Sequence, residues 1–159
     1  MDNAIIQPMQ QEKRRKQNAL VISLVTGALF TLVSIIVGPL AYNQNGINGL
    51  WGIGLTIVVS FSAFIAAFQI YREHVTLGIG VLIATILTMS LALPIVAQGQ
   101  GIALGVMLLI FVAGISSATL PPLWATRAII SAFIVASIIT LTDLYFPDFG
   151  LPTKPGYTN

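Results

Sequence analysis

The residues best able to do chemistry stand in one short polar segment, Arg72-Glu73-His74. His74 is the only histidine in the chain, and one histidine cannot supply a bis-histidine haem site. No second cluster of metal ligands stands near it in the sequence. We therefore interpret His74 as a solvated loop residue, with Arg72 and Glu73 solvated or weakly paired beside it.

Hydroxyl side chains recur within the apolar stretches, and together they could line a small polar cavity. Each of them can instead bond to the carbonyl one helical turn back or to a neighbouring helix, and that use needs no ligand. We favour this second interpretation for the whole set, which comprises Thr31, Ser60, Ser62, Thr85, Thr88, Ser90, Ser137 and Thr140.

No catalytic or cofactor motif accompanies these residues. The sequence has no phosphate-binding glycine loop, nucleophile elbow, zinc-ligand spacing or paired carboxylates. It has no cysteine, which excludes disulfides and thiolate chemistry. The deep intramembrane carboxylate, lysine or histidine that proton pathways often use is absent, and so is the lysine that retinal would need. We expect no enzymatic activity, no cofactor and no metal site.

The composition indicates how these residues must be positioned. Of 159 residues, 56% are hydrophobic and only 8% are charged, against about 25% charged in a soluble domain. Too few charges remain to cover a water-facing surface. The net charge of +2 is compatible with nucleic acid, but four of the seven basic residues stand together just before the first apolar stretch. We therefore predict a membrane protein and expect no nucleic-acid partner.

Five segments are long and apolar enough to cross a membrane, which takes roughly 20 residues. Before Asp143, in the last turn of the fifth, none holds a charged residue or the histidine. The first is too long for the apolar region of a cleaved signal peptide, so we interpret it as a membrane helix. The fold class is thus an all-α integral membrane protein. We predict three parts, namely a basic N-terminal segment at 1–18, a five-helix transmembrane domain at 19–146 and a tail at 147–159. The five helices are expected at 19–41, 50–70, 75–97, 102–120 and 128–145. We expect residues 1–12 and 149–159 to be loosely ordered.

The charge distribution predicts the orientation. With the N-terminus inside, six of the seven basic residues lie on the cytoplasmic side, as the positive-inside rule requires, and Lys154 alone lies outside. The six topology anchors are Lys13, Arg14, Arg15, Lys16, Arg72 and Arg127. Aromatic residues mark both interfaces, with Tyr42, Trp51, Tyr145 and Phe146 outside and Tyr71 and Trp124 inside. We expect a multi-pass protein of a bacterial cytoplasmic (inner) membrane, with its N-terminus inside and its C-terminus outside.

Small residues predict where the helices meet, because they allow close backbone approach in lipid. We expect three packing faces, one on each of three helices. They comprise Ser23, Gly27, Thr31, Ser34 and Gly38 on the first, Gly52, Thr56, Ala63 and Ala67 on the second, and Ala128, Ala132 and Ala136 on the fifth. Gly101 and Gly105 form an isolated GxxxG pair that could aid dimerisation.

An aromatic stripe follows a different side of the second helix. Phe61, Phe64, Phe68 and Tyr71 recur at helical spacing, and we expect them to face lipid or a partner subunit. A stripe of this kind could also bind a pigment or a quinone. Aromatic residues at helical spacing are far more often packing surface, so we assign no cofactor.

The whole pattern resembles the N-terminal multi-helix membrane region of bacterial sensor proteins such as histidine kinases and diguanylate cyclases. The resemblance covers about residues 13–152 and consists of hydropathy and turn patterns. It follows the basic start at 13–18, the turn at 71–74, the proline pair leading into the fifth helix at 121–128 and the close at 143–148. It implies a non-enzymatic sensing or input module, present here as a fragment or as a stand-alone relative, without the kinase or cyclase activity.

Two other functions stay open. The chain could be a small accessory or assembly subunit of a larger respiratory or photosynthetic membrane complex, with Phe61, Phe64 and Phe68 as its docking face. A transporter of a small neutral solute is a further alternative, although five helices do not divide into two equal halves. The expected partners are membrane lipid and other membrane subunits or further copies of this chain.

Overall fold

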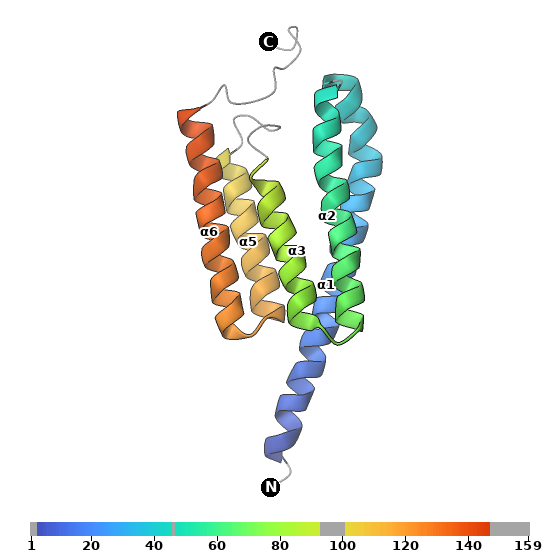
Figure 1. The fold of residues 1–159 in the computed structure, drawn as a ribbon, viewed down its shortest axis with the longest axis vertical. Helices are drawn as coiled ribbons and strands as arrows, with labels where there is room; N and C mark the ends of the chain where they lie inside the picture. Colours follow the sequence, from blue (N-terminus) through green and yellow to red (C-terminus); the bar gives the residue numbers. More distant parts are fainter. Residues whose placement is uncertain (1–2, 46, 93–100, 147–159) are drawn as a thin grey trace.

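The computed structural model describes residues 3–45, 47–92 and 101–146, and every element in these ranges is an α-helix (Figure 1). The helices are α1 (Asn3–Asn45), α2 (Ile47–Tyr71), α3 (Val75–Ser90), α5 (Gly101–Thr119) and α6 (Pro122–Tyr145). Four of them, α1, α2, α5 and α6, contain apolar stretches long enough to cross a membrane. The prediction of an all-helical fold is therefore confirmed for these residues, and the four apolar helices fit a membrane protein.

Helix α1 is longer than predicted at both ends. It has 43 residues, roughly 65 Å of helix, although a hydrocarbon core is only about 30 Å thick. Residues 3–12, which were expected to be loosely ordered, form the first turns of α1. The break predicted after residue 41 is wrong as far as Asn45, because polar residues can extend a helix once it leaves the apolar layer. Residues 149–159 lie outside the described ranges.

Prolines explain two other boundary errors. Helix α3 was predicted to reach Ala97, but it ends at Ser90, and Leu91 and Ala92 form a turn. A helical Pro94 would clash with the carbonyl of Ser90, four residues earlier. Residues 93–97 lie outside the described ranges. Helix α6 was predicted to start at Ala128, but it starts six residues earlier at Pro122, because proline is well suited to a first helical turn.

Consecutive helices run in opposite directions (Figure 1). Helix α1 packs along α2, α5 packs along α6, and α3 contacts α2 as well as α5 and α6. The beginning of α1 projects past the ends of the other helices (Figure 1). The start of α1, the α2–α3 turn and the α5–α6 turn therefore belong to one end of the molecule, which is called the charged end below.

Helices α2 and α3 approach most closely at Gly78, which is buried. A Cβ atom at this position would lie 2.7 Å from the carbonyl oxygen of Ala66 and 2.9 Å from Cγ1 of Ile70. Nonbonded heavy atoms normally stay about 3.5–4.0 Å apart, so no side chain fits here. Gly78 was not among the predicted packing residues, although a glycine in an apolar helix was a usable signal.

Candidate functional site

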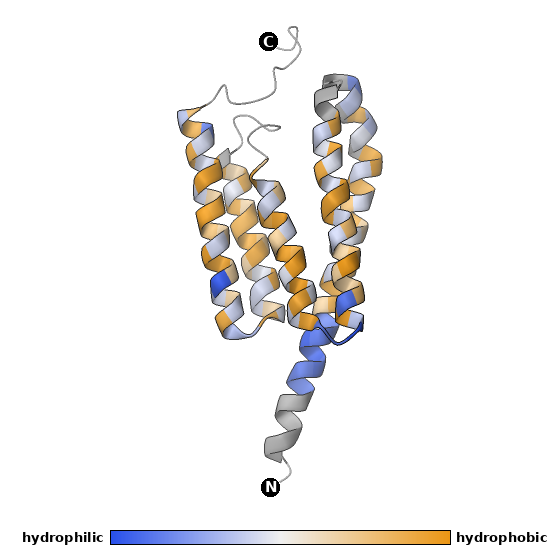
Figure 2. Cartoon of the chain, in the orientation of Figure 1, coloured by the Kyte–Doolittle hydropathy of each residue, from blue (hydrophilic) through white to orange (hydrophobic). Residues whose placement is uncertain are grey.

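The most hydrophilic residues gather mainly at one end of the molecule (Figure 2). The basic run at 13–16 lies on the projecting part of α1, residues 3–18, which is called the arm below. Arg72 and Glu73 follow α2, and Arg127 lies in the second turn of α6. These elements bring all six described lysines and arginines to the charged end. Asp143, near the end of α6, is the one described charged residue at the opposite end.

The α2–α3 turn has a defined backbone geometry. The Glu73 N–H donates to the carbonyl of Ile70 at 3.1 Å, and the His74 N–H donates to the carbonyl of Gln69 at 3.0 Å. This pair of bonds is a Schellman motif, which caps the last carbonyls of α2. Its left-handed position is occupied by Glu73, with φ of 71°, where glycine is usual.

The carboxylate of Glu73 forms an ion pair with Lys16, 57 residues earlier in the chain. The pair joins the arm to the α2–α3 turn. Glu73 is 76% exposed, so the pair contributes at most about 1 kcal/mol to stability. Its main consequence is geometric, because it holds the arm against this end of the bundle.

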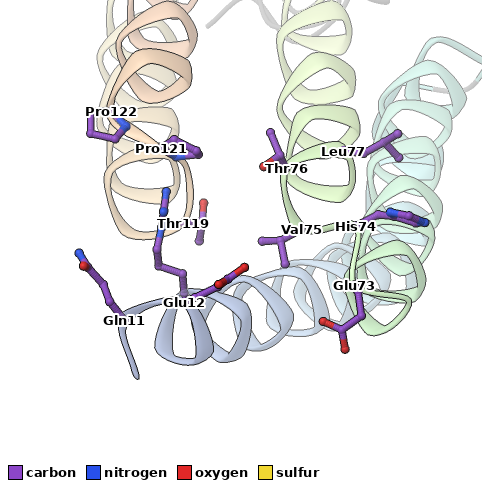
Figure 3. Close-up of a pocket in the computed structure, with 11 residues that line it drawn as sticks. Gln11, Glu12, Glu73, His74, Val75, Thr76, Leu77, Thr119, Pro121 and Pro122 are labelled. Atoms are coloured by element: carbon purple, nitrogen blue, oxygen red, sulfur yellow. The ribbon is translucent and has the colours of Figure 1, made fainter. Parts of the chain in front are cut away.

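A cavity of about 720 Å³ lies between the arm and the ends of the other helices. Gln11 and Glu12 approach it from the arm, while Thr119, Pro121 and Thr76 face them from the ends of the bundle (Figure 3). The remaining lining residues are Arg15, Glu73, His74, Val75, Leu77 and Pro122. His74 is exposed and belongs to this mixed polar wall.

The cavity wall carries charged and hydroxyl side chains. Within the described ranges, no three His, Asp or Glu side chains lie close enough to hold a metal ion. Thr119 is 1% exposed, and its hydroxyl donates to the carbonyl of Ile115 at 2.6 Å. The arrangement offers ionic and hydrogen-bonding contacts to a ligand.

A second feature is the polar seam between α1 and α2. The hydroxyl of Thr31 lies 2.6 Å from that of Ser60, and the hydroxyl of Ser34 lies 2.6 Å from that of Thr56. Thr31 and Ser60 are also within hydrogen-bonding distance of the carbonyl of Gly27, at 2.8 Å and 3.0 Å. Hydrogen bonds between hydroxyls in an apolar layer fix the register of the two helices.

Close packing accompanies these bonds at both ends of the seam. A Cβ atom at Gly27 would lie 3.1 Å from the ring of Phe64, and one at Gly38 would lie 3.3 Å from Ile53. Ser23 is fully buried, but its hydroxyl has no partner within the described structure. The structure thus brings all five small residues predicted on α1 to buried or half-buried positions.

The other predicted packing residues lie at several contacts. Gly52 and Thr56 are half-buried on α2, and Ala63 and Ala67 are buried. On α6, Ala132 and Ala136 are buried and Ala128 is half-buried. A Cβ atom at Gly105 would lie 3.3 Å from the carbonyl oxygen of Ala136, so this glycine packs within the chain. Ser60, at the centre of the seam, was not among the predicted packing residues, but it was expected to bond to its own helix or a neighbouring one, and it bonds to α1.

The aromatic stripe on α2 is largely exposed. Phe61 is 67% exposed, Phe68 53% and Tyr71 74%. Phe64 is 45% exposed, although its ring also packs on Gly27. The guanidinium of Arg72 lies 4.7 Å from the centre of the Phe68 ring, as a cation–π contact.

Comparisons with protein-family models, curated proteins and solved structures found no match to this chain.

Proposed function

We propose that the chain is a non-enzymatic membrane module with five crossings, an N-terminus inside and a C-terminus outside. Helix α3 has 16 described residues, roughly 24 Å, and it lies alongside the four longer helices (Figure 1). The opposite directions of α3 and α5 support a crossing by α3. The gathering of six basic residues at the charged end supports the orientation, since lysine and arginine concentrate in cytoplasmic segments.

We further propose that this module receives a signal, as the input region of a bacterial signalling protein does. The observation that carries this proposal is the continuity of α1, which runs from the arm into the bundle as one helix. A continuous helix transmits a shift between its ends, because its backbone hydrogen bonds keep it stiff. The Lys16–Glu73 pair and the α1–α2 hydroxyl bonds tie this helix to α2 at two levels.

Purification in a mild detergent, followed by mass spectrometry of the intact assembly, tests this function. An autonomous module is expected to appear as this chain alone or as copies of it. Other subunits in fixed stoichiometry would contradict an autonomous module.

The exposed aromatic stripe favours a second candidate, an accessory subunit of a larger membrane complex. Aromatic side chains are enriched at protein interfaces. In that case Phe61→Ala and Phe68→Ala are expected to release the co-purifying subunits. Phe133→Ala is the matched control, because Phe133 on α6 is 62% exposed and lies outside the stripe.

A further inference from the structure

We propose that the cavity at the charged end binds the phosphoethanolamine headgroup of a zwitterionic phospholipid. The proposal rests on the proposed function in one respect: the proposed orientation decides which leaflet of the membrane supplies the lipid. It depends on three features of the cavity, namely its unpaired charges, its position at the ends of the apolar helices and the absence of Phe, Tyr and Trp from its wall.

The first feature is a carboxylate and a guanidinium that face the same space. Glu12 and Arg15 lie three residues apart on α1, and both line the cavity. Within the described structure neither takes part in an ion pair, whereas Glu73, which also lines the cavity, is paired with Lys16. The wall therefore presents one negative and one positive group, neither of them held in an ion pair within the described structure. A ligand that pairs with both carries a cation and an anion.

The second feature is the position of the cavity along the helices. It lies where the apolar helices end, between the α2–α3 and α5–α6 turns and the charged arm (Figure 3). Its unpaired charged groups, Glu12 and Arg15, are on the arm, while Val75, Leu77 and the proline pair form its apolar side. A phospholipid presents the same order, with a charged headgroup above apolar chains. The volume of about 720 Å³ is within the range of about 300–1,000 Å³ that small-molecule sites occupy.

The third feature distinguishes between two zwitterionic headgroups. A quaternary ammonium, as in phosphatidylcholine, is typically recognised by an aromatic cage. None of the 11 lining residues is Phe, Tyr or Trp, the side chains that build such a cage. A primary ammonium donates hydrogen bonds that a carboxylate such as Glu12 accepts, and a phosphate accepts paired hydrogen bonds from a guanidinium such as Arg15. These contacts favour phosphatidylethanolamine over phosphatidylcholine, and over phosphatidylglycerol, which has no ammonium for Glu12.

The test is native mass spectrometry of the full chain in detergent micelles, titrated in turn with phosphatidylethanolamine, phosphatidylcholine and phosphatidylglycerol. We expect phosphatidylethanolamine to be retained best. Glu12→Gln and Arg15→Gln are each expected to weaken its retention about fivefold. Glu12→Gln is also expected to remove the preference over phosphatidylglycerol. Arg14→Gln is the matched control, because Arg14 carries the same charge on the same helix but does not line the cavity.

Equal retention of the three lipids by the unmodified chain would overturn the proposal, as would an equal effect of Arg14→Gln and Arg15→Gln. Soluble phosphoethanolamine is added as a competitor, and it is expected to displace the lipid. Binding of the soluble compound without retention of the lipid would overturn the lipid as its source. Circular dichroism of each variant checks folding, and if Arg15→Gln does not fold, Glu12→Gln decides the outcome alone. Bound lipid and protein subunits have different masses, so this result is separate from the test of the proposed function.

Discussion

The close approach of α2 and α3 at Gly78 allows a sharp test of how the bundle is packed. Gly78→Ala adds one methyl group at a point where it would lie 2.7 Å from a backbone carbonyl oxygen. The oxygen belongs to α2 itself, so it can move away only if the two helices separate by roughly 0.5–1 Å. The short α2–α3 turn, held by its Schellman bonds, resists that movement.

Gly80→Ala is the matched control. Gly80 lies on the same helix and is exposed, and a Cβ atom there would have nothing within 4 Å. Both substitutions gain the same helix propensity, about 0.8–1.0 kcal/mol, so this contribution cancels in their difference. What remains is the overpacking at Gly78, which typically costs about 1–3 kcal/mol.

The assay is thermal unfolding in detergent micelles, followed by circular dichroism. In a chain of this size, 1 kcal/mol corresponds to roughly 2–4 °C in melting temperature. We expect the Gly80→Ala variant to melt at or above the temperature of the unmodified chain, and the Gly78→Ala variant to melt clearly below Gly80→Ala. Equal melting temperatures for the two variants would refute the close α2–α3 contact.

Three further variants test other contacts. Gly27→Leu is expected to lower the melting temperature in detergent, because the new side chain meets the Phe64 ring at the α1–α2 seam. Gly54→Leu is the control and is expected to leave the melting temperature nearly unchanged, because a Cβ atom at Gly54 has nothing within 4 Å. Similar losses in both variants would refute close packing at the seam. Ser116→Ala is expected to raise the stability by about 1 kcal/mol in the same assay, since the buried hydroxyl has no partner within the described structure. A clear loss of stability would mean that the hydroxyl forms a stabilising hydrogen bond. Glu73→Gly is expected to stay as stable as the unmodified chain or to gain up to about 1 kcal/mol, because glycine relieves the left-handed backbone and the lost ion pair contributes little; strong destabilisation would show that the pair does more than position the arm.

Hydropathy predicted the helices well, because each apolar segment must satisfy its own backbone hydrogen bonds. The boundaries were less predictable. Charged and polar residues ended the predicted segments, whereas α1 continues through polar residues at both of its ends and α6 starts before Arg127. The start of α6 at Pro122 shows the difference, since its first six residues include Arg127 and were read as a connection.

The candidate site was harder to predict, because it depends on contacts between distant segments. Lys16 and Glu73 are 57 residues apart, and nothing in either local sequence indicates that they pair. The Arg72-Glu73-His74 segment was recognised as polar, but the cavity beside it exists only because the arm continues α1 beneath the turns. A prediction that began the first helix at Ala19 had no helical arm to place there.

The central claim is that the helices cross the membrane five times and leave the two chain ends on opposite sides. Because the chain has no cysteine, single cysteines at Gln10 and Thr153 can be tested one at a time with a membrane-impermeant maleimide on intact cells. Five crossings predict that the cysteine at position 153 reacts at once, whereas the cysteine at position 10 reacts only after the membrane is permeabilised. Labelling of both positions from the same side would mean an even number of crossings and would contradict the account.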